Sequence, residues 1–323
     1  MTWRVLVTAT SFGKVSNGAV RELEAAGCGL VTNPHGRPLT EAELAELVVG
    51  VDGVIAGVDP FTASVLAHAD RLRVIARRGA GLDGIDLAAA TRRGIAVTNT
   101  PGANSAAVAD LVLGLMLAMA RGLVPAARNL KEGRWVRPLG GELRGKTLGI
   151  VGFGRIGREV ARRAGGFGMR LLAHDPFWSQ QNAAALGVAR ADLDTVLAEA
   201  DFVSLHLPLN PSTDGLIGEA LLRRMRPTAF LINTARGELI DEAALVRVLQ
   251  EHRIAGAALD VFRQEPPFGS PLLDLPNVLA TPHLASQSRE AVEAMDREAV
   301  RNLLEVLAGR RPADLCNQEV WTA

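Results

Sequence analysis

Cysteine is scarce in this sequence, and neither sign of charge predominates. The 323 residues include only two cysteines, Cys28 and Cys316, which excludes a disulfide framework and a cysteine-rich zinc site. The chain carries 35 Lys and Arg against 35 Asp and Glu, so it has no general attraction for phosphate backbones. The histidines form no metal-ligand pattern. We therefore expect neither a nucleic-acid partner nor a metal site.

Long apolar segments are also absent. The most apolar run, residues 111–120, is too short to span a bilayer and is bordered by Asp110. The amino-terminal stretch MTWRVLVTAT lacks a charged region followed by an apolar core, so we predict no signal peptide. Hydrophobic residues make up 48% of the chain, which is enough for a buried core. These features predict a soluble cytoplasmic protein without a membrane partner, and the length favours about two domains.

Short apolar runs alternate with helical patterns along both halves of the chain. Alternation of this kind is typical of parallel strands joined by helical crossovers, so the predicted fold class is α/β. Thr40 and Glu43 have the spacing of a helix capping box. The predicted strands are residues 4–8, 53–56, 73–76, 95–97, 147–151, 170–174, 202–205, 229–233, 256–260 and 278–281. The predicted helices include residues 17–26, 105–121 and 289–308.

A glycine motif follows the predicted strand at 147–151. Gly152, Gly154 and Gly157 fit the pattern G-x-G-x-x-G, and the next strand runs to Asp175. The first glycine permits a tight turn, the second lets the backbone approach a pyrophosphate, and the third allows close packing of helix on strand. An acid at the position of Asp175 accepts hydrogen bonds from ribose hydroxyls and repels a 2′-phosphate. The motif therefore predicts NAD as cofactor in preference to NADP.

Three polar residues follow the last three predicted strands. Arg236, Glu265 and His283 each lie just beyond a strand end, where doubly wound sheets bind their ligands. A histidine transfers protons near neutral pH, and a neighbouring carboxylate orients it. An arginine binds a carboxylate with two hydrogen bonds and polarises a carbonyl. Together with NAD, this set predicts oxidation of a hydroxy acid to a keto acid.

Five segments from about residue 70 onwards resemble the D-isomer-specific 2-hydroxyacid dehydrogenases, especially the D-3-phosphoglycerate dehydrogenase-like branch. The segments are RRGAGLDGIDLAAATRRGIAVTNTPGANS, LRGKTLGIVGFGRIGREVA, INTARGELIDEAAL, GAALDVFRQEPP and TPHLAS. The resemblance implies two doubly wound parallel-sheet domains. A Rossmann NAD-binding domain, residues 101–286, is inserted into a flavodoxin-like substrate-binding domain, residues 1–100 plus 287–323. It also implies a homodimer formed through the NAD-binding domain, which would bury the apolar helix at 105–121.

The resemblance also implies roles for individual residues. His283 corresponds to the general acid and base, Glu265 to its partner, and Arg236 to the arginine that orients the substrate. The expected cofactor-binding residues are Gly152, Gly154, Arg155, Ile156, Gly157, Asp175, Leu207, Pro208, Thr213, Thr234, Ala235, Asp260 and Ala285. The expected substrate-binding residues are Arg77, Arg78, Gly79, Ala80, Gly81 and Asn104.

The substrate is left open, because Gly57 stands where phosphoglycerate dehydrogenases of the well-known type carry a phosphate-binding arginine. Arg77, Arg78 and Arg137 are alternative sources of positive charge. The main interpretation is an NAD-dependent dehydrogenase of a small anionic D-2-hydroxy acid. The alternatives are a glyoxylate or hydroxypyruvate reductase, an enzyme for a phosphonate-bearing acid and, in another class, a non-catalytic NAD(H) sensor.

Overall fold

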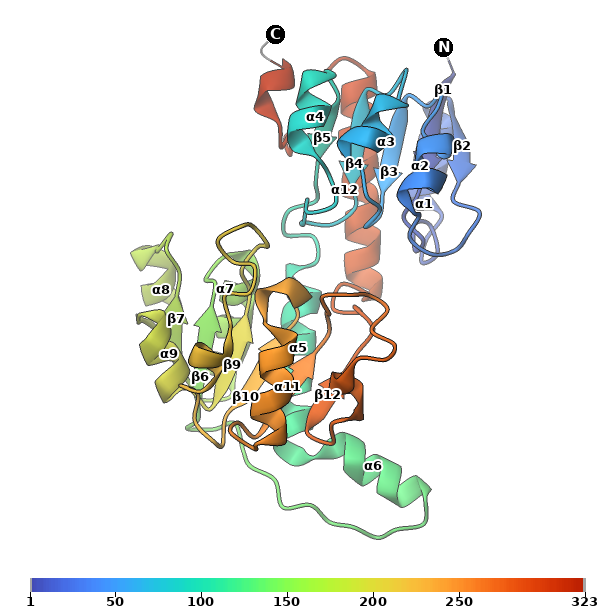
Figure 1. Cartoon of the computed structure of the whole chain (residues 1–323). Helices are drawn as coiled ribbons and strands as arrows, with labels where there is room; N and C mark the ends of the chain where they lie inside the picture. The colour runs from blue at the N-terminus through green and yellow to red at the C-terminus, as the bar shows by residue number, and fades with distance from the viewer. Residues whose placement is uncertain (1, 322–323) are drawn as a thin grey trace. The chain divides into compact units, whose positions relative to one another are not determined.

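The computed structural model describes residues 2–321 and divides into two compact units (Figure 1). Unit 1 comprises Met1–Asn104 together with Gln287–Ala323, and unit 2 comprises Ser105–Ser286. The chain thus leaves unit 1 once, builds unit 2 from a continuous segment, and returns. Each unit is a parallel sheet covered by helices on both faces, which confirms the predicted fold class.

In the described part of unit 1, five parallel strands are ordered β2-β1-β3-β4-β5, the order of a doubly wound flavodoxin-like sheet. The strands are β1 (Trp3–Val7), β2 (Cys28–Thr32), β3 (Gly53–Ala56), β4 (Val74–Arg77) and β5 (Ala96–Thr98). Apolar side chains of α1 and α12 cover one face, and those of α2, α3 and α4 cover the other. These helices are α1 (Gly18–Ala25), α2 (Glu41–Leu47), α3 (Ala63–Ala67), α4 (Leu87–Arg92) and α12 (Arg289–Leu307).

In the described part of unit 2, seven parallel strands are ordered β12-β11-β10-β9-β6-β7-β8. The strands are β6 (Thr147–Val151), β7 (Arg170–His174), β8 (Val188–Arg190), β9 (Phe202–Leu205), β10 (Phe230–Asn233), β11 (Gly256–Leu259) and β12 (Val278–Ala280). Helices α5, α7 and α8 cover one face, and α9, α10 and α11 cover the other. They are α5 (Ser105–Arg121), α7 (Arg155–Gly166), α8 (Gln180–Leu186), α9 (Leu193–Glu199), α10 (Glu219–Leu222) and α11 (Glu242–Gln250).

Two strands were not predicted from the sequence. Both β2 and β8 lie at an edge of their sheet and are partly exposed, so neither forms a continuous apolar run. The other strands lie within a residue or two of the predicted ranges. The capping box is confirmed, since the Thr40 hydroxyl accepts from the Glu43 amide and the Glu43 carboxylate accepts from the Thr40 amide.

The long apolar helix α5 packs inside unit 2, against α7 and against strands β10 and β11. Its buried positions, which include Val108, Val112 and Met116, account for much of the all-round apolar character of its sequence. Among the described helices none is long and apolar enough to cross a membrane alone. The bent pair α5 and α6 (Leu123–Lys131) passes the same test by length and composition only.

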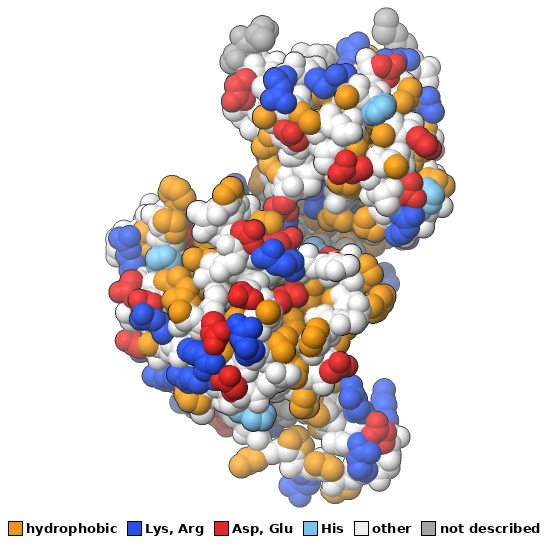
Figure 2. Space-filling view, viewed as in Figure 1, with side chains coloured by type: hydrophobic (Ala, Val, Ile, Leu, Met, Phe, Trp, Pro, Cys, Tyr) orange, Lys and Arg blue, Asp and Glu red, His pale blue; other side chains and the backbone are white. Residues whose placement is uncertain are grey.

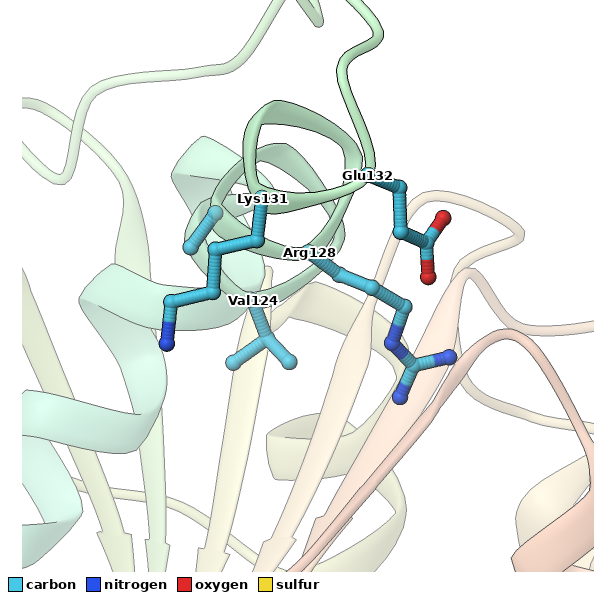
Figure 3. Close-up of a pocket in the computed structure, with 5 residues that line it drawn as sticks. Val124, Arg128, Lys131 and Glu132 are labelled. Atoms are coloured by element: carbon cyan, nitrogen blue, oxygen red, sulfur yellow. The ribbon is translucent and has the colours of Figure 1, made fainter.

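Helix α6 and the loop after it extend away from the body of unit 2 (Figure 1). None of the residues of α6 is fully buried, and Leu130 and Trp135 expose 59% and 81% of their surface. Figure 2 shows basic side chains gathered over the helix and hydrophobic side chains along the loop. Val124, Arg128 and Lys131 line a hollow of about 470 Å³ along one side of α6 (Figure 3).

Candidate active site

The predicted functional residues of unit 2 lie at the carboxyl ends of its strands, on either side of the point where the strand order reverses. Strand β6 is flanked by β9 on one side and β7 on the other, and each continues in the opposite direction across the sheet. Doubly wound sheets bind ligands at this switch point because the loops on its two sides diverge there. The glycine turn after β6 therefore lies at the edge of the sheet where such folds bind their ligands.

Two of the three glycines in the turn after β6 occupy positions that have no room for a side chain, and the third lies in open space. Gly152 has φ +99°, and a Cβ atom there would lie 2.6 Å from the His206 carbonyl oxygen. A Cβ on Gly157 would lie 2.2 Å from the Gly152 carbonyl oxygen, which keeps α7 tight against the turn. Gly154 caps α7, and a Cβ there would meet nothing within 4 Å. The turn is packed on its inner side and open at the helix N-terminus, as a pyrophosphate requires.

Asp175 directly follows β7, beside this turn, and is held by two peptide groups. One carboxylate oxygen accepts from the Phe153 amide at 2.6 Å and the other from the Phe177 amide at 2.7 Å. Each oxygen of a carboxylate has capacity for a further donor, so both remain able to receive ribose hydroxyls. The half-buried side chain thus lies where the sequence motif requires an acid.

The other predicted cofactor residues lie around the same edge of the sheet. Arg155 and Ile156 open α7, and Thr213 donates its hydroxyl to the Pro208 carbonyl at 2.7 Å. The buried Thr234 hydroxyl at the end of β10 finds no hydrogen-bond partner among residues 2–321. A buried hydroxyl without a hydrogen-bond partner destabilises the folded protein unless a ligand or a water molecule supplies that hydrogen bond. The open glycine turn, the acid and this hydroxyl fit a bound dinucleotide. Leu207, Ala235 and Ala285 lie on the neighbouring loops.

The turn that carries Arg236 is shaped by Asn233, which the sequence analysis missed. The Asn233 side chain accepts from the Ala235 amide at 3.0 Å and donates to the Arg236 carbonyl at 2.8 Å. The sequence signal for this role is one amide side chain, Asn233, at the end of the otherwise apolar strand FLIN. Gly237 then allows a close approach, because a Cβ there would lie within 2 Å of the Phe262 carbonyl carbon. This contact brings the Arg236 turn against the loop that leads to Glu265.

His283 and Glu265 are in direct contact. The His283 Nδ1 atom lies 2.8 Å from a Glu265 carboxylate oxygen, and the other oxygen accepts from the Phe262 amide at 3.1 Å. Burial alone would raise the pKa of Glu265. The hydrogen bond and charge of His283, the Phe262 amide and the charge of Arg236 together hold that pKa below its usual value. Both side chains are partly exposed, so the imidazole is both oriented and accessible.

Asp260 organises the loop that presents His283. It is fully buried, and its carboxylate accepts from the Thr281 hydroxyl at 2.6 Å and from the amides of Leu284 and Ala285, both at 2.9 Å. Its carbonyl accepts from the His283 amide at 2.8 Å. These bonds hold His283 at φ +48°, a left-handed conformation that few residues adopt without support. The predicted contact of Asp260 with the cofactor stays a prediction.

His206 at the end of β9 has no place in the proton chemistry. Its ring lies 2.9 Å from the Ser204 hydroxyl, and burial lowers the pKa of His206 to about 3. It is therefore neutral at physiological pH. No group of His, Cys, Asp or Glu within residues 2–321 is arranged to hold a metal ion.

The predicted substrate residues belong to unit 1, at the carboxyl ends of its own strands. The Arg77 guanidinium donates to the Arg78 carbonyl, and Arg78 is buried in an ion pair with Asp296. The Gly79 amide donates to the Thr100 hydroxyl at 2.9 Å. Ala80 is exposed, Gly81 is half-buried, and the buried Asn104 side-chain oxygen has no partner among the described residues.

Comparison with known proteins matches this arrangement to one family. The model of the D-isomer specific 2-hydroxyacid dehydrogenase NAD binding domain matches residues 113–285. A glyoxylate reductase of Korarchaeum cryptofilum is 45% identical over 291 residues, which is 88% of each chain. The chain belongs to the D-isomer specific 2-hydroxyacid dehydrogenase family.

Other relatives support the same family. A D-3-phosphoglycerate dehydrogenase of Methanocaldococcus jannaschii is 43% identical over 283 residues, which cover 86% of this chain and 54% of that protein. The crystal structure of the TT0316 protein of Thermus thermophilus has 43% sequence identity and a TM-score of 0.88. It covers 97% of this chain and 99% of that chain. This dehydrogenase is an NAD-dependent oxidoreductase that acts on the CH–OH group of its substrates.

Glu265→Gln is expected to lower kcat/KM for reduction of a keto acid and to remove the fall in kcat/KM that protonation of Glu265 causes in acid. The depressed pKa keeps Glu265 ionised until the pH falls below the ordinary glutamate range, so the charged contact with His283 persists in weak acid. Glutamine carries no charge and does not titrate, so the variant lacks this charged group at every pH. We expect the kcat/KM profile of the variant to have a lower plateau and no acid limb from this group. A plateau and an acid limb like those of the wild type would show that the charge of Glu265 does not support the reaction.

Proposed function

We propose that this dehydrogenase transfers a hydride between NAD(H) and a small D-2-hydroxy acid or 2-oxo acid, with His283 as its proton donor and acceptor. The observation that carries the proposal is the 2.8 Å contact between His283 and Glu265 at the carboxyl edge of the NAD-binding sheet. A contact of this kind fixes the ring so that its other nitrogen faces outward. Arg236, whose charge acts on Glu265, belongs to the same cluster.

Each side chain has a defined part in the proposed reaction. Bound NAD supplies the hydride acceptor, and NADH the donor, at the nicotinamide ring. In oxidation, the outward nitrogen of His283 takes the hydroxyl proton and Glu265 stabilises the imidazolium that forms. In reduction, protonated His283 returns that proton to the carbonyl oxygen. Arg236 binds the carboxylate and polarises the carbonyl oxygen, because a guanidinium presents parallel donors to both.

The region around Gly57 favours a small acid without a phosphate. A Cβ on Gly57 would lie 2.9 Å from a carboxylate oxygen of Asp59 and 3.2 Å from the Ala9 backbone, so this position has no room for a longer side chain. That Asp59 oxygen is buried and has no hydrogen-bond partner among the described residues. A buried carboxylate repels a phosphate dianion. We therefore propose glyoxylate or hydroxypyruvate as substrate. D-3-phosphoglycerate is the second candidate, supported by the 43% identity to an enzyme of that name.

A spectrophotometric panel tests the proposal. Purified protein is assayed by NADH absorbance with glyoxylate, hydroxypyruvate, a phosphonate analogue and 3-phosphoglycerate, and with both enantiomers of several 2-hydroxy acids. We expect turnover of the D-acids and of the small 2-oxo acids. A higher kcat/KM with 3-phosphoglycerate would overturn the substrate choice. Tight NADH binding without turnover of any acid would favour the non-catalytic sensor.

Asp175→Asn is expected to weaken the preference for NAD over NADP. The substitution removes the negative charge that repels a 2′-phosphate, while an amide of the same size still accepts one of the two peptide donors. We expect kcat/KM with NADP(H) to rise about tenfold and kcat/KM with NAD(H) to fall by a similar factor. A factor of ten corresponds to a change of about 1.4 kcal/mol in the interaction free energy with each cofactor. An unchanged ratio between the two cofactors would mean that Asp175 does not face the ribose.

We propose that the dehydrogenase is a homodimer that uses the α6 arm, which we define as residues 123–142. The arm carries exposed apolar side chains, including Leu130 and Trp135, and basic residues on the same helix. In a monomer these apolar side chains would stay exposed to water, which is unfavourable. A second copy of the NAD-binding unit would bury them. Sedimentation velocity is expected to give twice the mass of one chain, and Leu130→Glu combined with Trp135→Glu is expected to halve it. A monomeric wild-type protein would refute this assembly.

A further inference from the structure

The loop after β4 in unit 1 has a backbone that is fixed on both sides. The Arg78 amide donates to the Ala56 carbonyl at 3.0 Å, and the Gly79 amide donates to the Thr100 hydroxyl at 2.9 Å. The Ala80 carbonyl accepts from the Asn99 side chain at 2.8 Å. These bonds determine the direction of each peptide group in the loop.

The peptide N–H groups that follow are available to a ligand. The amides of Ala80 and Gly81 donate to no other group among the described residues, and Ala80 is exposed. Gly79 has φ +139°, a conformation that an L side chain rarely adopts. Successive N–H groups in such a turn form a small concave site for an anion. In the proposed function this site receives the carboxylate of the substrate.

The Arg78 side chain turns away from this anion site into the interior of unit 1. Arg78 is 7% exposed, and its Nε atom donates to the carboxylate of Asp296, which lies on α12 and is 3% exposed. The second oxygen of Asp296 accepts from the Gly13 amide at 3.0 Å. The Nη2 atom of Arg78 is buried without a partner in the described chain. A guanidinium enclosed in this way is a structural group and is not presented to a ligand.

We infer that Arg78 and Asp296 are positioning residues that hold the anion-binding amides of Ala80 and Gly81 in place. The buried pair ties the β4 loop to α12 and to the loop that contains Gly13. Removal of one partner leaves the other as an unpaired buried charge, which moves the backbone around it. Small displacements of a group that orients the substrate have large kinetic effects. The inference rests on the proposed function and assigns Arg78 a role different from the substrate contact expected from the sequence.

Asp296→Asn is the first test, with Glu293→Gln as control because Glu293 is an exposed acid on the same helix. We expect the KM of the 2-oxo acid to rise about tenfold or more. The affinity for NADH, measured by fluorescence titration, stays unchanged because the predicted cofactor residues belong to unit 2. We expect kcat to stay within about twofold of the wild-type value. This pattern is typical when the lost interaction stabilises the ground state and the transition state equally. A fall in active protein at constant KM would mean that the pair serves stability only.

Arg78→Met, alone and combined with Asp296→Leu, separates positioning from direct contact. Two apolar side chains can replace a buried ion pair without loss of stability. If the pair positions the loop, Arg78→Met alone raises KM about as much as Asp296→Asn, and the double variant recovers a KM near that of the wild type. If Arg78 itself binds the substrate, Asp296→Asn leaves KM unchanged and the double variant is as poor as Arg78→Met. That second pattern would overturn the inference.

Amide hydrogen exchange tests the inference without any turnover. The amides of Arg78 and Gly79, which are hydrogen-bonded in the wild type, are expected to exchange faster in Asp296→Asn than in the wild type or in Glu293→Gln, while the peptides of unit 2 exchange as before. If no 2-oxo acid is reduced but exchange at this loop accelerates, the proposed function fails and the positioning of the loop stands. Unchanged exchange at the Arg78 and Gly79 amides overturns the inference whatever the kinetics show.

Discussion

His283→Gln is expected to lower kcat by about 100- to 10,000-fold, the range that a positioned general acid or base contributes, and to leave the affinity for NADH unchanged. Glutamine keeps a polar side chain of similar reach but cannot transfer a proton at neutral pH. Glu265 loses its imidazole partner in this variant and remains hydrogen-bonded to the Phe262 amide, so the loop keeps one of its two contacts. Stopped-flow measurement of the hydride step together with fluorescence titration of NADH checks both parts of this result.

His252→Gln is the matched control for this substitution. His252 is an exposed histidine of the same unit and has φ +51°, close to the φ of +48° at His283. Both substitutions therefore place glutamine in a left-handed conformation, and any cost of that conformation is shared. The control is expected to retain full activity. A His283→Gln enzyme with more than about a tenth of the wild-type kcat would exclude His283 as the proton carrier.

Asp260→Ala is expected to destabilise unit 2 by on the order of 3 kcal/mol and to abolish most activity, although Asp260 transfers no proton in the proposed reaction. The substitution removes the acceptor of three buried or half-buried donors, which belong to Thr281, Leu284 and Ala285. Because these donors are left without an acceptor, the loop is expected to open. The left-handed backbone conformation of His283 then loses the hydrogen bonds that support it. Thermal unfolding is expected at a temperature lower by roughly 10 °C.

Asp260→Asn distinguishes the loss of charge from the loss of acceptors. The amide has the same volume but offers one acceptor oxygen and turns two hydrogens toward the remaining donors. We expect intermediate stability and a kcat that is still reduced at least tenfold, since the His283 loop is only partly fixed. Wild-type stability in both variants would show that the loop is held by its packing and not by this carboxylate.

The sequence predicted the elements whose signals are local. Uniform apolar runs such as Thr147–Val151 and Phe202–Leu205 gave strand positions that the structure confirms, and the edge strands β2 and β8 lacked such runs. The order of strand ends placed Arg236, Glu265 and His283 on one edge, because carboxyl ends of parallel strands meet there. Long-range partners had no such signal. Nothing in the sequence links Arg78 to Asp296, and the hydrogen bonds of Asp260 appear only when β11 and β12 are paired.

Helix α12 completes a sheet whose strands are all encoded within the first 104 residues. Arg78 and Asp296 are separated by 218 positions, and the apolar face of α12 covers β3, β4 and β5. During synthesis, unit 2 is made as one continuous segment and has all its strands before α12 exists. The N-terminal sheet must therefore remain with one face only partly covered, by α1, until α12 has been synthesised. The completion of this sheet is a long-range closure, so a nascent chain depends on α12 to cover apolar surface that could otherwise aggregate.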